Sequence, residues 1–177
     1  VYLGLKRLSA RASAANFNLD ELACVVPFAH ERGVSVYVAL NSAVTESERT
    51  GIPALLESLT RCEVDGVIVQ DPGIFAVARR FFPELRLHAS TLMAIHNHGG
   101  VRQLERMGAE RVVLARELTL KEIETIASKT SVGLEVFVHG ALCYAYSGLC
   151  MASSFRGGHG DCWPCTGLRR QIGRAHV

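Results

Sequence analysis

The chain has 177 residues, of which 49% are hydrophobic and 20% are charged, a balance that suits one globular domain with a sizeable core. The net charge of +2 gives no strong preference for nucleic acid and does not exclude it. No apolar run approaches the roughly 20 residues of a membrane-spanning helix, and no basic start is followed by an apolar signal core. We therefore expect a cytoplasmic protein in a reducing compartment.

Short apolar segments that predict β-strands alternate with segments of helical periodicity. The strand predictions are rich in Val, Leu and Ile, as expected of strands buried on both faces. They cover Val1–Gly4, Val34–Leu40, Gly66–Val69, Leu85–His88, Arg111–Ala115 and Leu134–Val138. The helix predictions are Leu19–Glu31, Glu46–Arg61, Ile74–Phe82, Gly100–Met107 and Leu118–Ser128. In the last helix, Thr119 and Glu122 have the spacing of a capping box.

This repetition predicts an α/β domain with a parallel sheet and right-handed crossovers. The pattern alone allows either an open doubly wound sheet or a (β/α)8 barrel. Connections of about 20 to 30 residues suit a barrel, although the predicted strands are too few to close one. No GxGxxG segment follows a strand, which disfavours a dinucleotide-binding fold.

The chain divides into three parts on composition. Residues 1–140 form the expected partial barrel, and residues 141–171 form a segment rich in Cys and Gly. The last six residues, Ile172–Val177, read IGRAHV, which matches the translation of a common sequencing adapter. Because the chain also starts without Met in a predicted strand, we interpret it as a fragment whose residues 172–177 are a non-native read-through tail.

Polar residues follow all six predicted strands at the same end. Because the carboxyl ends of parallel strands meet at one edge of the sheet, these residues predict a shared pocket. The substrate-binding candidates are Arg11, Asn41, Gln70, Asp71, Thr91, Asn97 and His139. The catalytic candidates are His88, Arg116 and Glu117.

Each catalytic candidate has a functional and a structural interpretation. His88 is either a general acid or base, or a ring that orients a substrate carboxylate, or a hydrogen-bonded structural histidine. Arg116 either binds an anion while Glu117 orients its guanidinium, or forms a local ion pair at the barrel rim. His96 and His98 resemble a metal pair only superficially, because residues two apart diverge on a helix.

Cysteines gather in the last fifth of the chain. Clustered thiols without a secretory signal are more often metal ligands than disulfides. The four are Cys143, Cys150, Cys162 and Cys165. A zinc ribbon normally has two close pairs, so this irregular spacing suits a 4Fe–4S cluster at least as well. A redox Cys-x-x-Cys at the last two positions and free cysteines are the alternatives. His139, four residues before Cys143, is expected to support the site.

Several segments together resemble the U-32 (collagenase-like) peptidase family, in the right order and up to about Cys165. They are VYLG-x-KRLSARASAANF, LDELACVVPFAHERGVSVYVALN, DGVIVQDPG, HASTLMAIHN, RVVLARELTL and EVFVHGALCYAYSGLC. The resemblance implies a TIM-barrel-like domain and a 4Fe–4S cluster. Cys143 and Cys150 match the first two cluster cysteines of the family and Cys162 the third. Relatives have a longer loop and a fourth ligand further along, so Cys165 is either a displaced ligand or a bystander.

The resemblance implies two competing activities. Some family members are credited with collagen degradation, and others hydroxylate tRNA, rRNA or the ubiquinone ring without molecular oxygen, with prephenate as oxygen donor or ligand in some cases. We favour hydroxylation, because the chain has no GxSxG or HExxH motif and iron-bound cysteines cannot be nucleophiles. Arg116 and Arg11 would then pair with the carboxylates of prephenate.

Three kinds of substrate and one further role stay open. RNA, a quinone precursor or a peptide could be the substrate, with peptide-bond hydrolysis as the alternative reaction. A non-catalytic iron–sulfur subunit that binds a second family member is a third hypothesis.

Overall fold

A single parallel sheet forms the centre of the computed structural model, which describes residues 1–6, 8–10, 16–139 and 145–149. Its six strands lie in sequence order, and each pairs in parallel with the next. They are β1 (Tyr2–Gly4), β2 (Tyr37–Leu40), β3 (Gly66–Val69), β4 (Arg86–Ala89), β5 (Arg111–Val113) and β6 (Gly133–Glu135). A doubly wound sheet would reverse its strand order, so this order confirms the barrel-like alternative.

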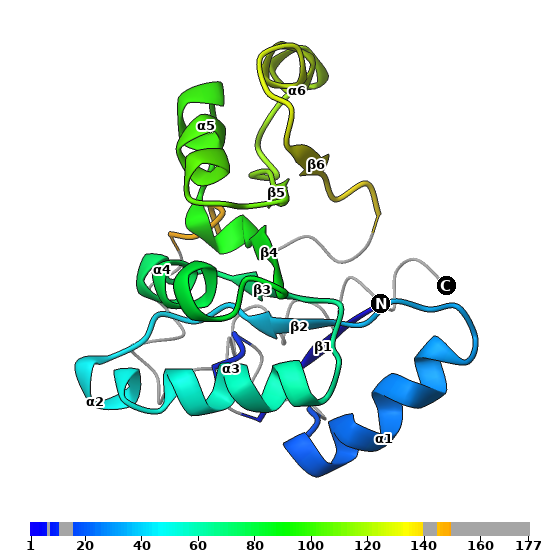
Figure 1. Cartoon of the computed structure of the whole chain (residues 1–177). Coiled ribbons are helices and arrows are strands. Elements are labelled where there is room, and N and C mark those ends of the chain that lie inside the picture. Colours follow the sequence, from blue (N-terminus) through cyan, green and yellow to red (C-terminus); the bar gives the residue numbers. More distant parts are fainter. Residues whose placement is uncertain (7, 11–15, 140–144, 150–177) are drawn as a thin grey trace.

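Helices connect the strands and lie around the outside of the curved sheet (Figure 1). Sequential right-handed crossovers that each advance by one strand place every connecting helix on the same face. The elements are α1 (Leu19–His30), α2 (Glu46–Arg49), α3 (Ile52–Arg61), α4 (Pro72–Phe81), the 3-10 helix η1 (Thr91–Met93), α5 (His98–Arg106) and α6 (Leu120–Ala127). The capping box predicted at Thr119 and Glu122 is present at the start of α6.

The two faces of the sheet differ in character. Val38, Val67 and Leu87 are paired across β2, β3 and β4, and their side chains are buried within the main hydrophobic core. Because side chains alternate along a strand, the neighbouring register positions, including Arg86 and His88, share the opposite face. That face would line the interior of a barrel, and it carries charged as well as apolar residues.

The segment 46–61 forms two helices instead of the single one that its periodicity predicts. α2 ends at Arg49, and α3 begins at Ile52 with Pro53 in its first turn. A proline in the interior of one long helix would remove a hydrogen bond and clash with the preceding turn, so the chain restarts at Gly51.

Four predicted strands are shorter than expected: β1 lacks Val1, β5 ends at Val113 instead of Ala115, and β2 and β6 are shortened as well. β6 ends at Glu135, because its partner β5 ends at Val113, and the apolar residues 136–138 beyond it are exposed. β2 starts only at Tyr37, after a loop whose Val36 N–H donates to the Asp65 carboxylate instead of to a neighbouring strand. Apolar composition alone does not mark where pairing with a neighbour stops.

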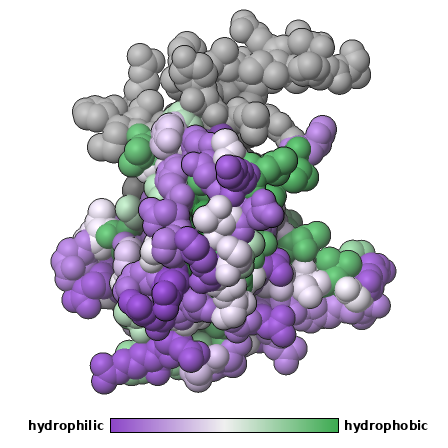
Figure 2. All heavy atoms as spheres, turned by 90° about the horizontal axis from the view of Figure 1, so that it is seen from above, coloured by the Kyte–Doolittle hydropathy of each residue, from purple (hydrophilic) through white to green (hydrophobic). Residues whose placement is uncertain are grey.

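The surface seen from above is mainly hydrophilic, with hydrophobic residues in small separate areas (Figure 2). Within the described residues, no helix is both long and apolar enough to cross a membrane.

Candidate functional site at the carboxyl ends of the strands

The loops after β3, β4 and β5 contact one another at the carboxyl edge of the sheet, and those after β4 and β5 also contact a later segment, residues 145–149. The Gln70 side-chain amide donates to Leu92 O at 3.5 Å, and Thr91 Oγ1 donates to Leu114 O at 3.3 Å. Ala115 N–H donates to Ile95 O at 3.1 Å. The loops that follow three neighbouring strands are therefore tied to one another.

Arg116 holds the later segment against these loops. Its backbone N–H and its Nε both donate to Ser147 Oγ, at 3.3 and 3.2 Å, and its Nη2 donates to Ala145 O at 2.8 Å. Only 16% of the Arg116 side chain is exposed, and Ser147 is buried. A guanidinium carries donors in a fixed fork, so these contacts define the orientation of the arginine.

Glu117 completes the contact with the same segment. Ser147 N–H donates to Glu117 Oε1 at 2.9 Å, and Arg116 Nη2 lies 3.8 Å from that oxygen. Burial raises the pKa of Glu117, but the hydrogen bonds from Ser147 outweigh it, and with the Arg116 charge they hold this pKa below its ordinary value. Glu117 is therefore a carboxylate at neutral pH.

His96 faces the second oxygen of Glu117. Its Nδ1 lies 2.8 Å from Ala94 O and must donate, since a carbonyl only accepts. The Nε2 then lies 3.3 Å from Glu117 Oε2, within ion-pair distance, yet both atoms are buried without a well-directed hydrogen bond among the described residues. The His96 ring also stacks on Tyr146, with centroids 5.2 Å apart. Sequence reasoning dismissed His96, although its place between a strand and the helix that begins at His98 was a usable signal.

Gly148 allows the segment to approach the loop after β4. Its φ is +75°, a conformation that favours glycine, and a Cβ at this position would lie 2.5 Å from Leu92 O. Ala94, in the loop opposite, also adopts a left-handed conformation, with φ of 56°. The close packing of two distant segments thus depends on the absence of a side chain at Gly148.

His88 lies away from this site. It is the third residue of β4, is buried, and stacks on Tyr37 of β2 with ring centroids 4.6 Å apart. Burial, together with the charges of Arg111 and Arg86, lowers the pKa of His88 to about 4. The structure therefore does not bring His88 together with Arg116 and Glu117, and it places a neutral ring inside the sheet.

Several substrate-binding candidates have local structural contacts. Asp71 caps α4, with Oδ1 accepting from Gly73 N–H at 2.7 Å and Oδ2 accepting from Val44 N–H at 3.3 Å. Asn97 caps α5 through Gly100 N–H, and Asn41 Oδ1 accepts from Ala10 N–H at 3.0 Å. These contacts explain why polar residues follow strands here without requiring a ligand.

Of the remaining predicted site residues, the structure describes His139. His139 is exposed beyond β6. Arg11, Cys143, Cys150, Cys162 and Cys165 lie outside the described residues, as do the tail at 172–177 and all of the segment 141–171 except residues 145–149. Within the described ranges, no group of three or more His, Cys, Asp or Glu side chains could hold a metal ion.

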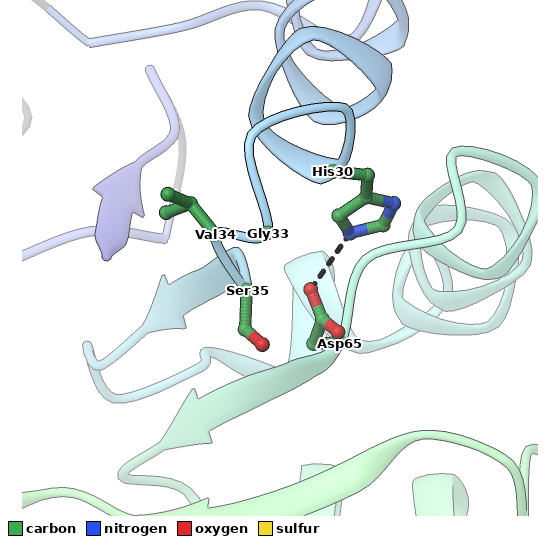
Figure 3. A pocket seen from close by; sticks show the side chains of 5 residues that line it. All are labelled: His30, Gly33, Val34, Ser35 and Asp65. Carbon is green, nitrogen blue, oxygen red and sulfur yellow. Dashed lines mark hydrogen bonds and ion pairs between the residues drawn. The ribbon is translucent and has the colours of Figure 1, made fainter.

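A shallow pocket lies at the opposite, amino-terminal edge of the sheet (Figure 3). It is lined by His30, Gly33, Val34, Ser35 and Asp65, and the His30 ring points toward Asp65. The Asp65 carboxylate accepts from Val36 N–H at 2.6 Å and lies 2.9 Å from His30 Nε2. These contacts join the end of α1 to the starts of β2 and β3, which is a structural function.

Comparison with known families decides where the chain belongs. Residues 1–166 match the model of Peptidase family U32. The chain belongs to the U32 peptidase family. The structure of the U32 peptidase Mk0906 is similar with a TM-score of 0.67 and 22% identity, over 76% of this chain and 58% of that one. At this level of identity the structural likeness supports the fold alone.

Relatives of this chain are named for different activities. The tRNA hydroxylation protein P1 of Bacillus subtilis (strain 168) is 36% identical over 87% of this chain. A 23S rRNA 5-hydroxycytidine synthase of Escherichia coli (strain K12) is 39% identical over 92%, and an uncharacterized protease of Methanocaldococcus jannaschii is 39% identical over 93%. The chain spans 36%, 25% and 41% of the lengths of these three proteins, respectively.

Proposed function

We propose that this U32 chain is part of an enzyme that hydroxylates RNA without molecular oxygen. The observation that carries the proposal is the similarity of nearly the whole chain to hydroxylation proteins for both tRNA and 23S rRNA. Because tRNA and rRNA are its proposed substrates, we also propose a cytoplasmic location.

The geometry favours this role over peptide hydrolysis. A hydrolytic serine needs a base within hydrogen-bond reach of its hydroxyl. The Ser147 hydroxyl accepts from Arg116, and the Ser90 hydroxyl accepts from Leu92 N–H at 3.1 Å, so both have local structural roles. His88 stacks on Tyr37 and has no hydrogen bond to a serine in the part of the chain that the structure describes.

We propose a 4Fe–4S cluster as the cofactor, with Cys143, Cys150 and Cys162 as ligands. Thiolates are soft donors of the type that iron–sulfur clusters use, and the sequence gathers them in one segment. Such a cluster supplies one-electron chemistry, while the protein controls its solvent exposure and surrounding charge. The family resemblance remains the support for this assignment.

A small dicarboxylate such as prephenate is the proposed ligand at the carboxyl edge of the sheet. Arg116 is a basic side chain at this edge among the described residues. Its Nε and Nη2 already donate to Ser147 and Ala145, so a bound carboxylate would compete with these contacts. A ligand that displaces them would loosen residues 145–149.

Comparison of modified nucleosides tests the RNA proposal. Hydroxylated uridine or cytidine should disappear from tRNA or rRNA in cells that lack the intact protein and should return on complementation. Mass spectrometry of the digested RNA measures these nucleosides. Quinone intermediates measured in the same cells test whether a quinone precursor is the substrate instead. The peptidase would be favoured if the nucleosides were unchanged and the protein, purified without oxygen, were colourless and iron-free and cleaved gelatin. Iron-containing protein that changes neither nucleosides nor quinones would favour the partner subunit.

A further inference from the structure

We propose that Arg116, Glu117 and Ser147 form a clamp that positions the segment between two cluster cysteines. Ser147 lies between Cys143 and Cys150 in the sequence. The inference rests on the proposed function, because it takes these two cysteines as ligands of the cluster. It gives Arg116 and Glu117 a positioning role toward the iron–sulfur centre, in addition to the carboxylate contact proposed for Arg116.

The contacts of the clamp converge on one residue. The Ser147 hydroxyl accepts from the backbone and the side chain of Arg116, and the Ser147 N–H donates to Glu117. Ser147 is 1% exposed, so both its backbone and its side chain are removed from solvent. Charged hydrogen bonds in such surroundings are stronger than neutral bonds in water.

Neighbouring residues add contacts on both sides of Ser147. Tyr146 stacks on the His96 ring, and Ala145 O accepts from Arg116 Nη2. Gly148 packs against Leu92 O and Ala94. Four consecutive residues are therefore fixed to the loops after β4 and β5, which is more than a single surface ion pair provides.

This arrangement limits where a cluster can lie. Cys150 lies three positions after Ser147 in the sequence, and Cys143 lies four positions before it. A fully extended chain spans at most about 3.5 Å per residue, so four positions of chain reach no further than about 14 Å. A cluster bound by these thiols is thereby held near the carboxyl edge of β4 and β5.

Loss of the clamp should weaken retention of the cluster. Groups that orient metal ligands typically change metal affinity by about 10-fold to 100-fold when they are removed. We therefore expect Ser147→Ala and Glu117→Ala to speed chelator-driven iron loss by about 10-fold or more. Glu117→Gln should recover much of the loss, because its amide oxygen still accepts from Ser147 N–H.

The experiment uses the intact protein, purified without oxygen. Iron content, the rate of loss of cluster absorbance in chelator and the hydrogen exchange of the Ser147 amide are measured for each variant. Arg49→Ala is the matched control, because it breaks an Arg–Glu pair of 2.8 Å on α2 without contact to residues 145–149. Far-UV circular dichroism tests whether each variant is folded. Arg116→Lys keeps the positive charge but loses the forked donors of the guanidinium, and it replaces any variant that does not fold.

The outcomes separate the clamp from the cluster. Faster iron loss with faster Ser147 exchange in the clamp variants, and neither in Arg49→Ala, supports the proposal. Folded clamp variants with wild-type iron retention and wild-type exchange overturn it. If the wild-type protein contains no iron and the clamp variants change only the exchange of the Ser147 amide, the assignment to the cluster is wrong. The cofactor of the proposed function is then wrong as well, and the clamp has a purely structural role.

Discussion

His88 and His96 show why the position of a residue along the sequence does not define its role. His88 was the stronger candidate because it stands at the end of an apolar run. It is an internal residue of β4 on the interior face of the sheet, stacked on Tyr37. His96 lies seven residues beyond β4, and the backbone around Ala94 brings its ring to Glu117.

The neutral state of His88 gives a pH dependence of stability. Its pKa falls from 6.5 to about 4 on folding, so between these values the unfolded chain binds a proton that the folded chain does not. The free energy of unfolding should therefore decrease by as much as about 3 kcal/mol as the pH falls through this window. His88→Phe keeps a ring against Tyr37 and should remove this slope. Urea unfolding across the window measures it, and an unchanged slope in the variant would contradict the assignment.

Asp65 gives a second pH dependence at lower pH. Burial raises its pKa, but hydrogen bonds from Val36 N–H and His30, with the charges of His30 and Arg86, hold it below its ordinary value of 3.8. Its stabilisation is thus present above pH 3.8 and is lost as the pH falls through the lower folded value. Asp65→Asn should reduce the free energy of unfolding by about 2 kcal/mol at neutral pH. The difference from wild type should shrink in acid; a constant difference would show that the charge is unimportant.

At the scale of elements, caps and prolines explain both the correct and the incorrect boundaries. The capping box at Thr119 and Glu122 was recognisable because it depends on two residues at fixed spacing. The break between α2 and α3 follows from Pro53, a local signal that the periodicity of the segment concealed. The end of β6 was not predictable, because it depends on where its partner β5 ends.

Asp71 distinguishes an element-level role from a binding role. Because its carboxylate caps α4 and also accepts from Val44 N–H, Asp71→Ala should cost about 1–2 kcal/mol in unfolding free energy. Asp71→Asn keeps one oxygen to cap α4 but loses the acceptor for Val44 N–H, so it should cost less than Asp71→Ala, about 1 kcal/mol. Denaturant unfolding compares the two variants. If Asp71→Asn is stable but RNA hydroxylation is lost, the carboxylate has a function beyond the cap.

At the scale of the whole molecule, the site depends on the meeting of segments that are distant in the sequence. Arg116 and Ser147 are 31 residues apart, and they contact because the loops of neighbouring strands share one edge of the sheet. Gly148 permits this packing against the loop after β4. The fold thus converts polar residues that follow separate strands into one connected group.

Gly148→Ala should loosen residues 145–149 without unfolding the sheet, because the added Cβ would lie 2.5 Å from Leu92 O. Hydrogen exchange of these amides should accelerate by about 10-fold, the effect of about 1.4 kcal/mol. Gly33→Ala is the control, since Gly33 also has a positive φ, of 67°, but has no atom within 4 Å of its Cβ position. That control should cost stability through backbone strain alone and leave exchange at 145–149 unchanged. Equal exchange in the two variants would contradict the steric argument.

The sequence by itself determined the alternation of six strands with helices and the positions of most of their centres. These features follow from local composition and periodicity, which a chain carries before it folds. It also placed polar residues, among them Gln70, Thr91, Arg116 and Glu117, at one edge of a parallel sheet. The tertiary structure decided which of them meet. The pairing of Arg116 with Ser147, the inclusion of His96 and the exclusion of His88 depend on loop conformation and on close packing between distant segments, which no local pattern records.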